Sequence, residues 1–384
     1  MNYNKNFDKL ENEYIFSKIR QSASAFKKTD YELIDLGVGD VKLPLFEETV
    51  SAMKNACQEM QEEKTFKGYP PANGYQFLRD KISNHYLSIG ADVLSDEIFI
   101  TDGAKGQLGS ITELFSFGID VLFQSPCYPA GAEANVLKGN NVDFLVTSEQ
   151  DNFIPYPPIG KRYDLIYLCS PCNPTGAVMS RKELSIWVEY ALKTGAVIIF
   201  DGAYDEFVFG DYPKSIYQIR GAKECAIEVR SFSKSLGFTG IRCGYTVIPK
   251  SLKNLNNLYF QWLGRRFNGV SYISQRGAET FFDKDVKTKL QKRINFYKTN
   301  AEILKIALKN LNLWYNNSMC SPYVFAKTPS GKNSADFCQK LLENLGIVAT
   351  PGSGFLKGGE GYFRLSAFCN REAAINASDR LKHL

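Results

Sequence analysis

The sequence predicts an α/β protein with a mostly parallel sheet, followed by a smaller α+β segment. In the middle of the chain, short apolar runs alternate with stretches of helical pattern. Several runs are apolar at consecutive positions, which is typical of strands that helices cover on both faces. From about residue 286, the apolar positions recur instead at intervals of three and four, as in an amphipathic helix. These three observations predict the fold class.

Seven apolar runs predict the strands of the sheet. They are Glu97–Thr101, Asp120–Gln124, Val142–Val146, Asp164–Cys169, Ala196–Phe200, Ala226–Arg230 and Tyr245–Ile248. Helical segments lie between most of them, for example Lys182–Lys193, which we expect Gly195 to end just before the next strand. Strands with interleaved helices imply an α/β domain.

The C-terminal part has a different pattern. Apolar residues at 286, 290, 294, 297, 301, 304, 308 and 311 predict one long helix. Short strands at Tyr323–Lys327 and Tyr362–Ser366 and a helix at Ser334–Leu345 follow. The first forty residues have too little apolar core of their own. We therefore expect an N-terminal segment (1–42) packed on the small domain, a large domain (43–275) and a small C-terminal domain (276–384).

The composition excludes several classes of protein. The 384 residues are 44% hydrophobic and 23% charged, with a net charge of +5 and scattered lysines and arginines. We expect neither a nucleic-acid nor a membrane partner, since no basic cluster and no apolar stretch of membrane-spanning length is present. The polar N-terminus carries both signs of charge and is unlike a secretory signal, so we expect a cytoplasmic location.

Nine cysteines are spread along the chain, and their odd number argues against a disulfide scaffold. Cys169 and Cys172 have the spacing of a redox dithiol, but Cys172 runs into the turn Asn-Pro-Thr-Gly and not into a helix start. A zinc site would need two more ligands. We expect no metal site, and treat the cysteines as small, mostly buried apolar residues. With only His85 and His383 present, a serine–histidine pair is not expected either.

Polar residues stand at four places beside the predicted strands. Asp201 ends the run AVIIF, the segment Ser231–Lys234 follows the strand at 226–230, and Arg242 lies between two glycines eight residues past Lys234. The segment Asp102–Lys105 follows the first predicted strand and precedes a helix. We expect all four at the carboxyl ends of the strands, which is the edge where open parallel sheets bind ligands.

Each feature alone has an ordinary structural explanation. An aspartate before glycine is a common turn, most lysines and arginines are surface residues, and a strand often passes through a turn into a helix. Together they match the needs of pyridoxal 5'-phosphate (PLP). Hydroxyls, an arginine and a helix start can anchor its phosphate, a carboxylate can keep its ring nitrogen protonated, and a lysine amine can react with its aldehyde.

Longer stretches carry a resemblance to a known family. They are Leu36–Asp40, Lys67–Tyr69, SDEIFITDGAK, Cys169–Gly176, Phe200–Tyr204, SIYQIRGAKECAIEVRSFSKSLGFTGIRCGYTVIPK, FNGVSYISQRGAE, TPGSGF and Tyr362–Ser366. In these the chain resembles the class I/II aminotransferases of the fold type I PLP enzymes, and the LL-diaminopimelate aminotransferase family in particular. The resemblance runs nearly end to end, and it implies a homodimer with shared active sites.

The resemblance also implies how the cofactor would be held. Lys234 would carry it as a Schiff base and shuttle the proton at the substrate α-carbon, and Asp201 would hold the protonated ring nitrogen. Tyr204 and Asn173 would hydrogen-bond its phenolic oxygen, while Tyr128 would stack on its ring. The phosphate would lie among Ala104, Lys105, Ser231, Ser233 and Arg242, with Tyr69 reaching in from the neighbouring subunit.

Substrate contacts follow from the same resemblance. Arg364 would grip the α-carboxylate in a bidentate pair. The other residues that would face the substrate are Tyr14, Gly39, Lys105, Tyr128 and Asn173. Asn268 would come from across the dimer and contact both cofactor and substrate.

The activity that this family implies is transamination in two half-reactions, between an amino acid and a 2-oxo acid. The first candidate is formation of LL-diaminopimelate from tetrahydrodipicolinate, with glutamate as donor, in lysine biosynthesis. However, Ala72 stands where the diaminopimelate branch usually has a glutamate that reads the distal end of the substrate, and Cys172 replaces an asparagine. The alternatives are an aminotransferase of the same family for another amino acid, and a PLP-dependent C–S lyase. A regulator's sensor module would need a DNA-binding domain for which the chain has no room, and an inactive binding protein is disfavoured because every expected cofactor contact is present.

Overall fold

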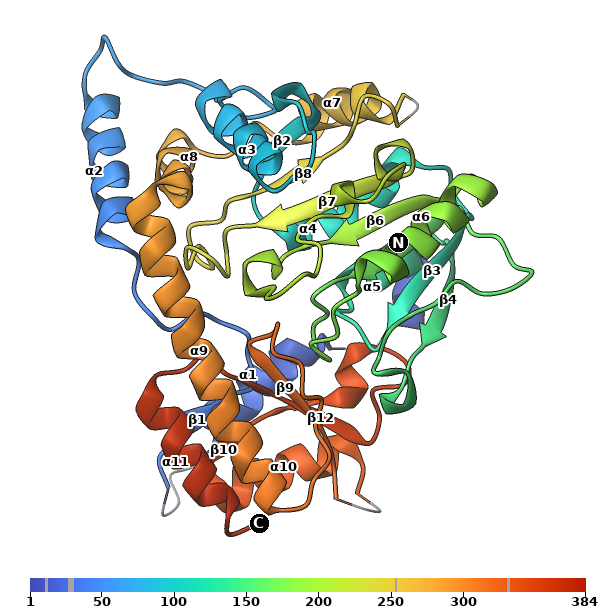
Figure 1. Cartoon of the computed structure of the whole chain (residues 1–384), viewed down its shortest axis with the longest axis vertical. Coiled ribbons are helices and arrows are strands. Elements are labelled where there is room, and N and C mark those ends of the chain that lie inside the picture. The colour runs from blue at the N-terminus through green and yellow to red at the C-terminus, as the bar shows by residue number, and fades with distance from the viewer. Residues whose placement is uncertain (11–12, 27–30, 253, 330–331) are drawn as a thin grey trace.

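The computed structural model describes residues 1–10, 13–26, 31–252, 254–329 and 332–384. A seven-stranded sheet occupies the upper part of Figure 1, and two smaller sheets lie below it. The strands are β1 (Ile34–Asp35), β2 (Ile98–Thr101), β3 (Asp120–Ser125), β4 (Asn141–Val146), β5 (Leu165–Cys169), β6 (Val197–Asp201), β7 (Ala226–Ser231), β8 (Gly244–Val247), β9 (Tyr323–Lys327), β10 (Ile347–Val348), β11 (Thr350–Pro351) and β12 (Tyr362–Ser366). The α-helices are α1 (Ile15–Ala25), α2 (Glu47–Gln61), α3 (Gln76–Ser88), α4 (Ala104–Ser110), α5 (Ala130–Lys138), α6 (Arg181–Thr194), α7 (Leu255–Arg266), α8 (Tyr272–Glu279), α9 (Lys284–Asn310), α10 (Ser334–Leu345) and α11 (Arg371–Leu381).

The large sheet has the strand order β2-β8-β7-β6-β5-β3-β4. Its neighbours are parallel from β7 through β4, and only β8 is antiparallel to the strands on both of its sides. The predicted mostly parallel seven-stranded sheet is therefore confirmed. The predicted strand bounds agree with the observed ones to within one residue at each end.

Helices cover both faces of this sheet, as the consecutive apolar positions predicted. Along β6, Ile198 and Phe200 pack into one apolar cluster while Val197 and Ile199 pack into another on the opposite face. Residues of α3 and α6 belong to the first cluster, and residues of α4, α5 and α7 belong to the second. The edge strand β4 is exposed at both ends and only half-buried between them, because it has a neighbour on one side alone.

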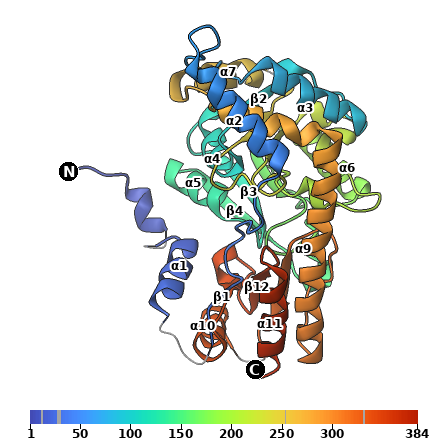
Figure 2. The ribbon, with the colours of Figure 1, turned by 90° about the vertical axis from the view of Figure 1, so that its left-hand side faces the viewer.

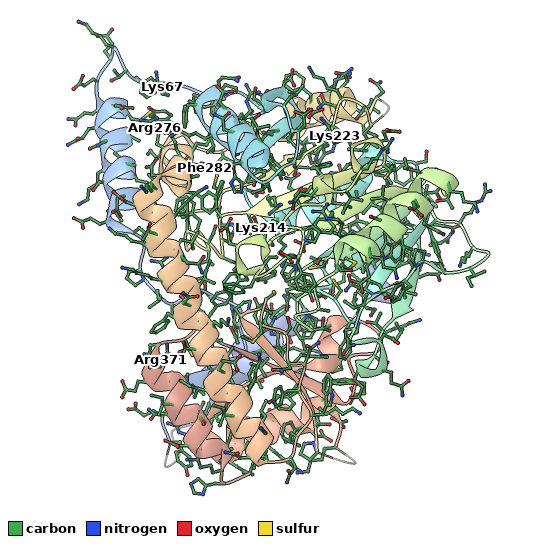
Figure 3. All side chains as sticks on the ribbon, in the orientation of Figure 1. Lys67, Lys214, Lys223, Arg276, Phe282 and Arg371 are labelled. Atoms are coloured by element: carbon green, nitrogen blue, oxygen red, sulfur yellow. The ribbon has the colours of Figure 1, made fainter. Side chains whose placement is uncertain are left out.

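The predicted long helix is α9, whose apolar stripe is buried along its whole length. It runs past the large sheet and down to the small one, with α11 beside its lower half (Figures 1 and 2). In Figure 3, Phe282 lies at the upper end of α9 and Arg371 lies where α11 begins, next to the middle of α9. Arg371 donates a hydrogen bond to the Phe296 carbonyl there.

The N-terminal segment contacts the C-terminal part of the chain. Its strand β1 pairs in parallel with β10, and Ile19 of α1 packs against Leu342 and Val348. The small sheet has the order β11-β12-β9, with both pairs antiparallel, and places Arg364 at the centre of β12 between Thr350 and Phe325. Within the described ranges, no helix has both the length and the apolar character needed to cross a lipid bilayer.

Candidate active site

A cavity of about 650 Å³ lies at the edge of the large sheet and is also lined by the N-terminal segment and the small sheet. It brings together most of the residues that the sequence singled out. These are Tyr14, Gly39, Ala104, Lys105, Tyr128, Asn173, Asp201, Tyr204, Ser231, Ser233, Lys234, Arg242 and Arg364. Tyr69 and Asn268, the two residues expected from a neighbouring subunit, do not line the cavity of their own chain, and both are exposed.

Sheet topology explains why three of the four polar features meet. Asp201 is the last residue of β6 and Ser231 the last residue of β7, so both lie at the carboxyl edge. The helix α4 begins at Ala104, three residues after β2 ends at that edge. The prediction that Arg242 also follows a strand end was wrong, because it lies two residues before β8 begins. It still reaches the cavity, since β8 runs antiparallel and starts where β7 ends.

Lys234 projects from the loop after β7 into the cavity and donates a hydrogen bond to the Gly39 carbonyl. Burial lowers the pKa of the Lys234 ammonium to about 8, against the raising effect of the Asp40 carboxylate. A fraction of this amine is therefore neutral near pH 8. A neutral amine is the form that attacks a carbonyl carbon.

Asp201 is buried at the end of β6, with 8% of its surface exposed. Its carboxylate accepts a hydrogen bond of 3.0 Å from the Ala203 backbone N–H. Burial raises the pKa of Asp201 to about 6, although hydrogen bonds from Ala203 and from the Cys169 thiol lower it. No salt bridge is found for this carboxylate among the described residues. Such a group gains strongly from a cationic partner placed in the cavity.

Two serine hydroxyls and an arginine form a compact donor group in the same cavity. The Ser231 hydroxyl donates to Ser233 Oγ at 2.9 Å, and Arg242 Nη1 donates to the same Ser233 Oγ at 3.1 Å. Gly103 leaves room for the arginine, because a Cβ at Gly103 would lie 2.3 Å from Arg242 Nη2. This combination of hydroxyls and a guanidinium beside the start of α4 suits a phosphate.

Arg364 is 1% exposed and reaches the cavity from β12. Its Nη1 donates to Asn173 Oδ1 at 2.6 Å and its Nη2 to the Gly37 carbonyl at 2.5 Å, while Nε finds no partner in the described part of the chain. The guanidinium also lies 4.3 Å from the Tyr323 ring centroid. Burial lowers the pKa of Arg364, against the raising effect of nearby tyrosines and of Asp35. The described residues provide no ion pair for this guanidinium. A buried guanidinium without an ion pair is a ready receptor for a carboxylate.

Tyr323, for which the sequence predicted no role, links the small sheet to the large one across the cavity. The hydroxyls of Tyr204 and Tyr323 are 2.8 Å apart, and burial raises the pKa of the Tyr204 phenol. Gly39 permits this approach, because a Cβ there would lie 2.1 Å from the Tyr323 hydroxyl. Tyr323 begins the predicted strand at 323–327, but nothing in that pattern pointed to a site.

The N-terminal segment closes one side of the cavity. The Tyr14 hydroxyl donates to the Tyr128 hydroxyl at 3.0 Å, and the Lys105 ammonium lies 4.2 Å from the Tyr14 ring centroid. Other lining residues were not singled out from the sequence: Phe16, Ser17, Arg20, Val38, Asp40, Leu108, Ala203, Thr239 and Gly240. Five of these residues belong to stretches that carried the resemblance, namely Val38, Asp40, Ala203, Thr239 and Gly240. The proximity of the N-terminal residues depends on long-range packing.

Three buried cysteines form a cluster next to Asp201. The Sγ atoms of Cys127, Cys169 and Cys172 all lie within 4.8 Å of one another, and none is in a disulfide. Burial raises the pKa of the Cys172 thiol, but hydrogen bonds with the other two thiols and with Thr175 hold it well below its usual value. Of the nine cysteines, Cys57 alone is exposed, so the expectation of mostly buried cysteines is confirmed.

Comparisons with known proteins agree with this geometry. The family model for aminotransferase class I and II matches residues 31–381. The chain is 42% identical to an LL-diaminopimelate aminotransferase of Agathobacter rectalis, over 99% of both chains. It is 41% identical to one of Bacteroides fragilis, over 99% of this chain and 98% of the other.

Solved structures show the same likeness. The L,L-diaminopimelate aminotransferase of Chlamydomonas reinhardtii superposes with a TM-score of 0.94 at 35% identity, covering 100% of this chain and 98% of that one. The aspartate aminotransferase of Thermus thermophilus with maleate superposes with a TM-score of 0.89 over 100% and 99% of the two chains. At 20% identity, the second comparison bears on the fold alone.

Proposed function

Because this chain belongs to the class I and II aminotransferases, we propose that it transfers an amino group between LL-diaminopimelate and 2-oxoglutarate. In the biosynthetic direction, glutamate would be the donor and tetrahydrodipicolinate the acceptor. The relatives that bear this name match the chain over nearly its full length. One observation supports the proposal above all. A single cavity holds a lysine whose pKa is lowered to about 8 by burial, a buried carboxylate, and a buried arginine for which the described residues provide no ion pair.

The cavity fits PLP, the cofactor that this family implies. Its donor set consists of the Lys234 amine, the buried Asp201 carboxylate, and the hydroxyl and guanidinium group around Ser233 and Arg242. These match an aldehyde, a pyridine nitrogen and a phosphate. When bound, PLP supplies an electron sink that stabilises negative charge on the substrate α-carbon.

The residues around the cofactor ring would then have distinct tasks. Lys234 would hold the cofactor covalently and move a proton at the substrate α-carbon. Asp201 would keep the proton on the ring nitrogen, and Tyr128 would cover the ring face. Tyr204 and Asn173 would donate hydrogen bonds to the phenolic oxygen.

The remaining residues would hold the phosphate and the substrate. We assign the phosphate to Ala104, Lys105, Ser231, Ser233 and Arg242, together with the partner subunit's Tyr69. Arg364 would bind the α-carboxylate, with Tyr14, Gly39, Lys105, Tyr128 and Asn173 around the substrate. The partner subunit's Asn268 would contact cofactor and substrate. The exposure of Tyr69, 87% in the single chain, supports a homodimer that shares its active sites.

We also propose a division of the chain into an N-terminal segment at 1–42, a cofactor domain at 43–275 and a small domain at 276–384. The separate apolar clusters around the large sheet and around α10 and β12 support it. In that arrangement, Arg364 of the small domain and Tyr14 of the N-terminal segment would close over a substrate on the large domain.

A second candidate substrate class rests on Ala72. The resemblance to the diaminopimelate branch implies a glutamate at this position, whereas Ala72 packs against the apolar cluster that contains residues of α4 and α7. Without that carboxylate, a distal ammonium on the substrate loses a partner. An amino acid that lacks a distal ammonium is the alternative donor.

A half-reaction screen distinguishes the two candidates. The PLP form of the enzyme is mixed with LL-diaminopimelate, with its meso isomer and with single proteinogenic amino acids, and conversion of the cofactor to its amine form is followed by absorbance. The proposal predicts fastest conversion with LL-diaminopimelate, and recovery of the starting spectrum on adding 2-oxoglutarate. Failure with LL-diaminopimelate and fast conversion by another amino acid would establish the alternative.

A further inference from the structure

The three cysteines Cys127, Cys169 and Cys172 form a cluster whose geometry no step of transamination uses. They come from two segments, the loop after β3 and the end of β5 with the turn that follows it. We propose that this three-thiol cluster is a binding site for a thiophilic divalent metal ion, with Zn²⁺ as the ion that it fits. This revises the expectation of no metal site, which counted only the pair Cys169 and Cys172 as possible ligands.

The spacing of the sulfur atoms suits such an ion. All three Sγ atoms lie within 4.8 Å of one another. With zinc–sulfur bonds of about 2.3 Å in a tetrahedron, sulfur ligands stand roughly 3.8 Å apart. Adjustments of about 1 Å would therefore bring the thiols into ligating positions. Soft sulfur ligands select Zn²⁺ over Mg²⁺ and Ca²⁺, which prefer oxygen.

The surroundings of the cluster also suit an enclosed ion. Cys127, Cys169 and Cys172 are 8%, 2% and 1% exposed. Apart from the hydrogen bonds among the thiols, the Cys169 and Cys172 sulfurs meet the carbonyls of Pro171 and Pro126, at 3.3 and 3.6 Å. Phe153, Phe325 and other apolar side chains surround the cluster and exclude water. Thiols that ligated an ion here would compete with little solvent.

The cluster lies next to the active-site cavity. Cys127 is followed by Tyr128 and Cys172 by Asn173, and both of these neighbours line the cavity. The Cys169 thiol faces the carboxylate of Asp201, which lines it too. Three thiolates leave the fourth position of a tetrahedral ion to a water molecule.

Binding is a proton exchange that needs no other reactant. The ion displaces one proton from each thiol, so that three protons are released and a complex with a net charge of −1 forms. No oxidant or reductant takes part. The ion would lie next to Asp201. Its charge would therefore act on the carboxylate that lines the cavity.

Cadmium is the probe that tests the site, because cadmium thiolates absorb in the ultraviolet. The reduced, chelator-treated PLP enzyme, carrying Cys57→Ser to remove the exposed thiol, is titrated with Cd²⁺. We expect one equivalent per chain to produce the thiolate charge-transfer band, with release of protons measurable in weak buffer. Zn²⁺ should compete for the same equivalent.

Single variants assign the ligands. Cys127→Ser, Cys169→Ser and Cys172→Asn should each weaken Cd²⁺ binding on the order of 100-fold or more, since losing even an indirect support of a metal ligand costs up to about that factor. Cys225→Ala is the matched control, because Cys225 is equally buried but lies outside the cluster and faces the carbonyls of Val188 and Gly221. It should bind Cd²⁺ as tightly as the parent. Circular dichroism checks folding, and if one cluster variant does not fold, the other two decide.

Three results would overturn the proposal. They are the absence of a band at one equivalent in the parent protein, a band that survives in every folded cluster variant, and a loss in Cys225→Ala as large as in those variants. The titration contains no substrate, so its outcome is independent of whether LL-diaminopimelate is the amino donor.

Discussion

The guanidinium of Arg364 donates a hydrogen bond of 2.6 Å to the side-chain oxygen of Asn173. This bond joins the central strand of the small sheet to the loop that follows β5 of the large sheet. Because Asn173 also lines the cavity, the residue proposed to bind the substrate carboxylate is fixed against a residue proposed to contact the cofactor.

Replacing Arg364 with lysine keeps the charge but removes the planar fork. Each hydrogen bond to a charged group contributes about 1.5–3 kcal/mol. We therefore expect kcat/KM to fall roughly 10- to 100-fold for both the amino acid and the 2-oxo acid, mainly through KM. Arg371→Lys is the matched control, since Arg371 lies over the ring of Phe296 on α9 and does not line the cavity. Unchanged KM values for both substrates would exclude Arg364 as the carboxylate receptor.

Replacing Asp201 with asparagine tests the buried carboxylate. A neutral amide of nearly the same shape cannot stabilise a protonated ring nitrogen, so kcat should fall on the order of 100-fold or more. PLP should still bind, because the lysine and the phosphate donors are intact. The control is Asp143→Asn on the edge strand β4, where the carboxylate pairs with Lys161 at the surface. Near-normal turnover of Asp201→Asn would contradict its role.

The rate of PLP capture by the cofactor-free enzyme should depend on pH through Lys234. Its amine is the nucleophile only when neutral, and burial lowers its pKa to about 8. The capture rate should therefore rise about tenfold per pH unit well below pH 8 and level off above it. In the unfolded chain, the pKa returns to about 10.4. The unfolded chain then holds the extra proton between these values, so this group adds stability as the pH rises through that interval. Stopped-flow absorbance measures the capture rate. A rate that keeps rising beyond pH 9 would mean that the pKa of the Lys234 amine is not lowered.

Replacing Gly39 with alanine should damage the cavity through one contact. The added methyl group would lie 2.1 Å from the Tyr323 hydroxyl, which must then move away from its partner Tyr204. Losing one neutral hydrogen bond costs about 0.5–1.5 kcal/mol, and the displacement of Tyr323 adds to this cost. We expect kcat/KM to fall at least about tenfold. Gly264→Ala on α7 is the control, because a Cβ there meets no atom within 4 Å. Equal activity of the two variants would show that Tyr323 can move away from the added methyl group without loss of function.

Complementation tests the shared active site. Chains with Lys234→Ala and chains with Tyr69→Ala are expressed together and compared with each variant alone. In a mixed dimer, one site receives an intact Lys234 from one chain and an intact Tyr69 from the other. Random pairing should restore up to about a quarter of wild-type activity, since half of the dimers are mixed and each has one intact site. Activity no greater than that of the two separate variants would rule out a Tyr69 supplied across the interface.

The strands and the long helix could be predicted because their apolar patterns are local. The pattern of 286–311 identified α9, and the consecutive apolar residues before Asp201 identified β6. The reversed direction of β8 could not be read from its sequence, because a short buried strand looks the same in either direction. This is why Arg242 was placed after a strand when it precedes one.

The site residues that lie in local sequence motifs were predicted, and those without such a motif were not. Asp201, Lys234 and Arg242 follow or precede strands of one sheet, and topology brings such residues together. Tyr323 and Cys127 carried no signal, because their neighbours in space are more than forty residues away in sequence. Only the packing of distant segments gives them a place beside the cavity.

The most direct test of the account is to locate the cofactor on the chain. The PLP enzyme is reduced with borohydride, which fixes the cofactor to the amine that holds it, then digested and examined by mass spectrometry. The account predicts the label on Lys234, in the peptide that follows β7. A label on another lysine, such as Lys105, or the absence of any fixed label would contradict it.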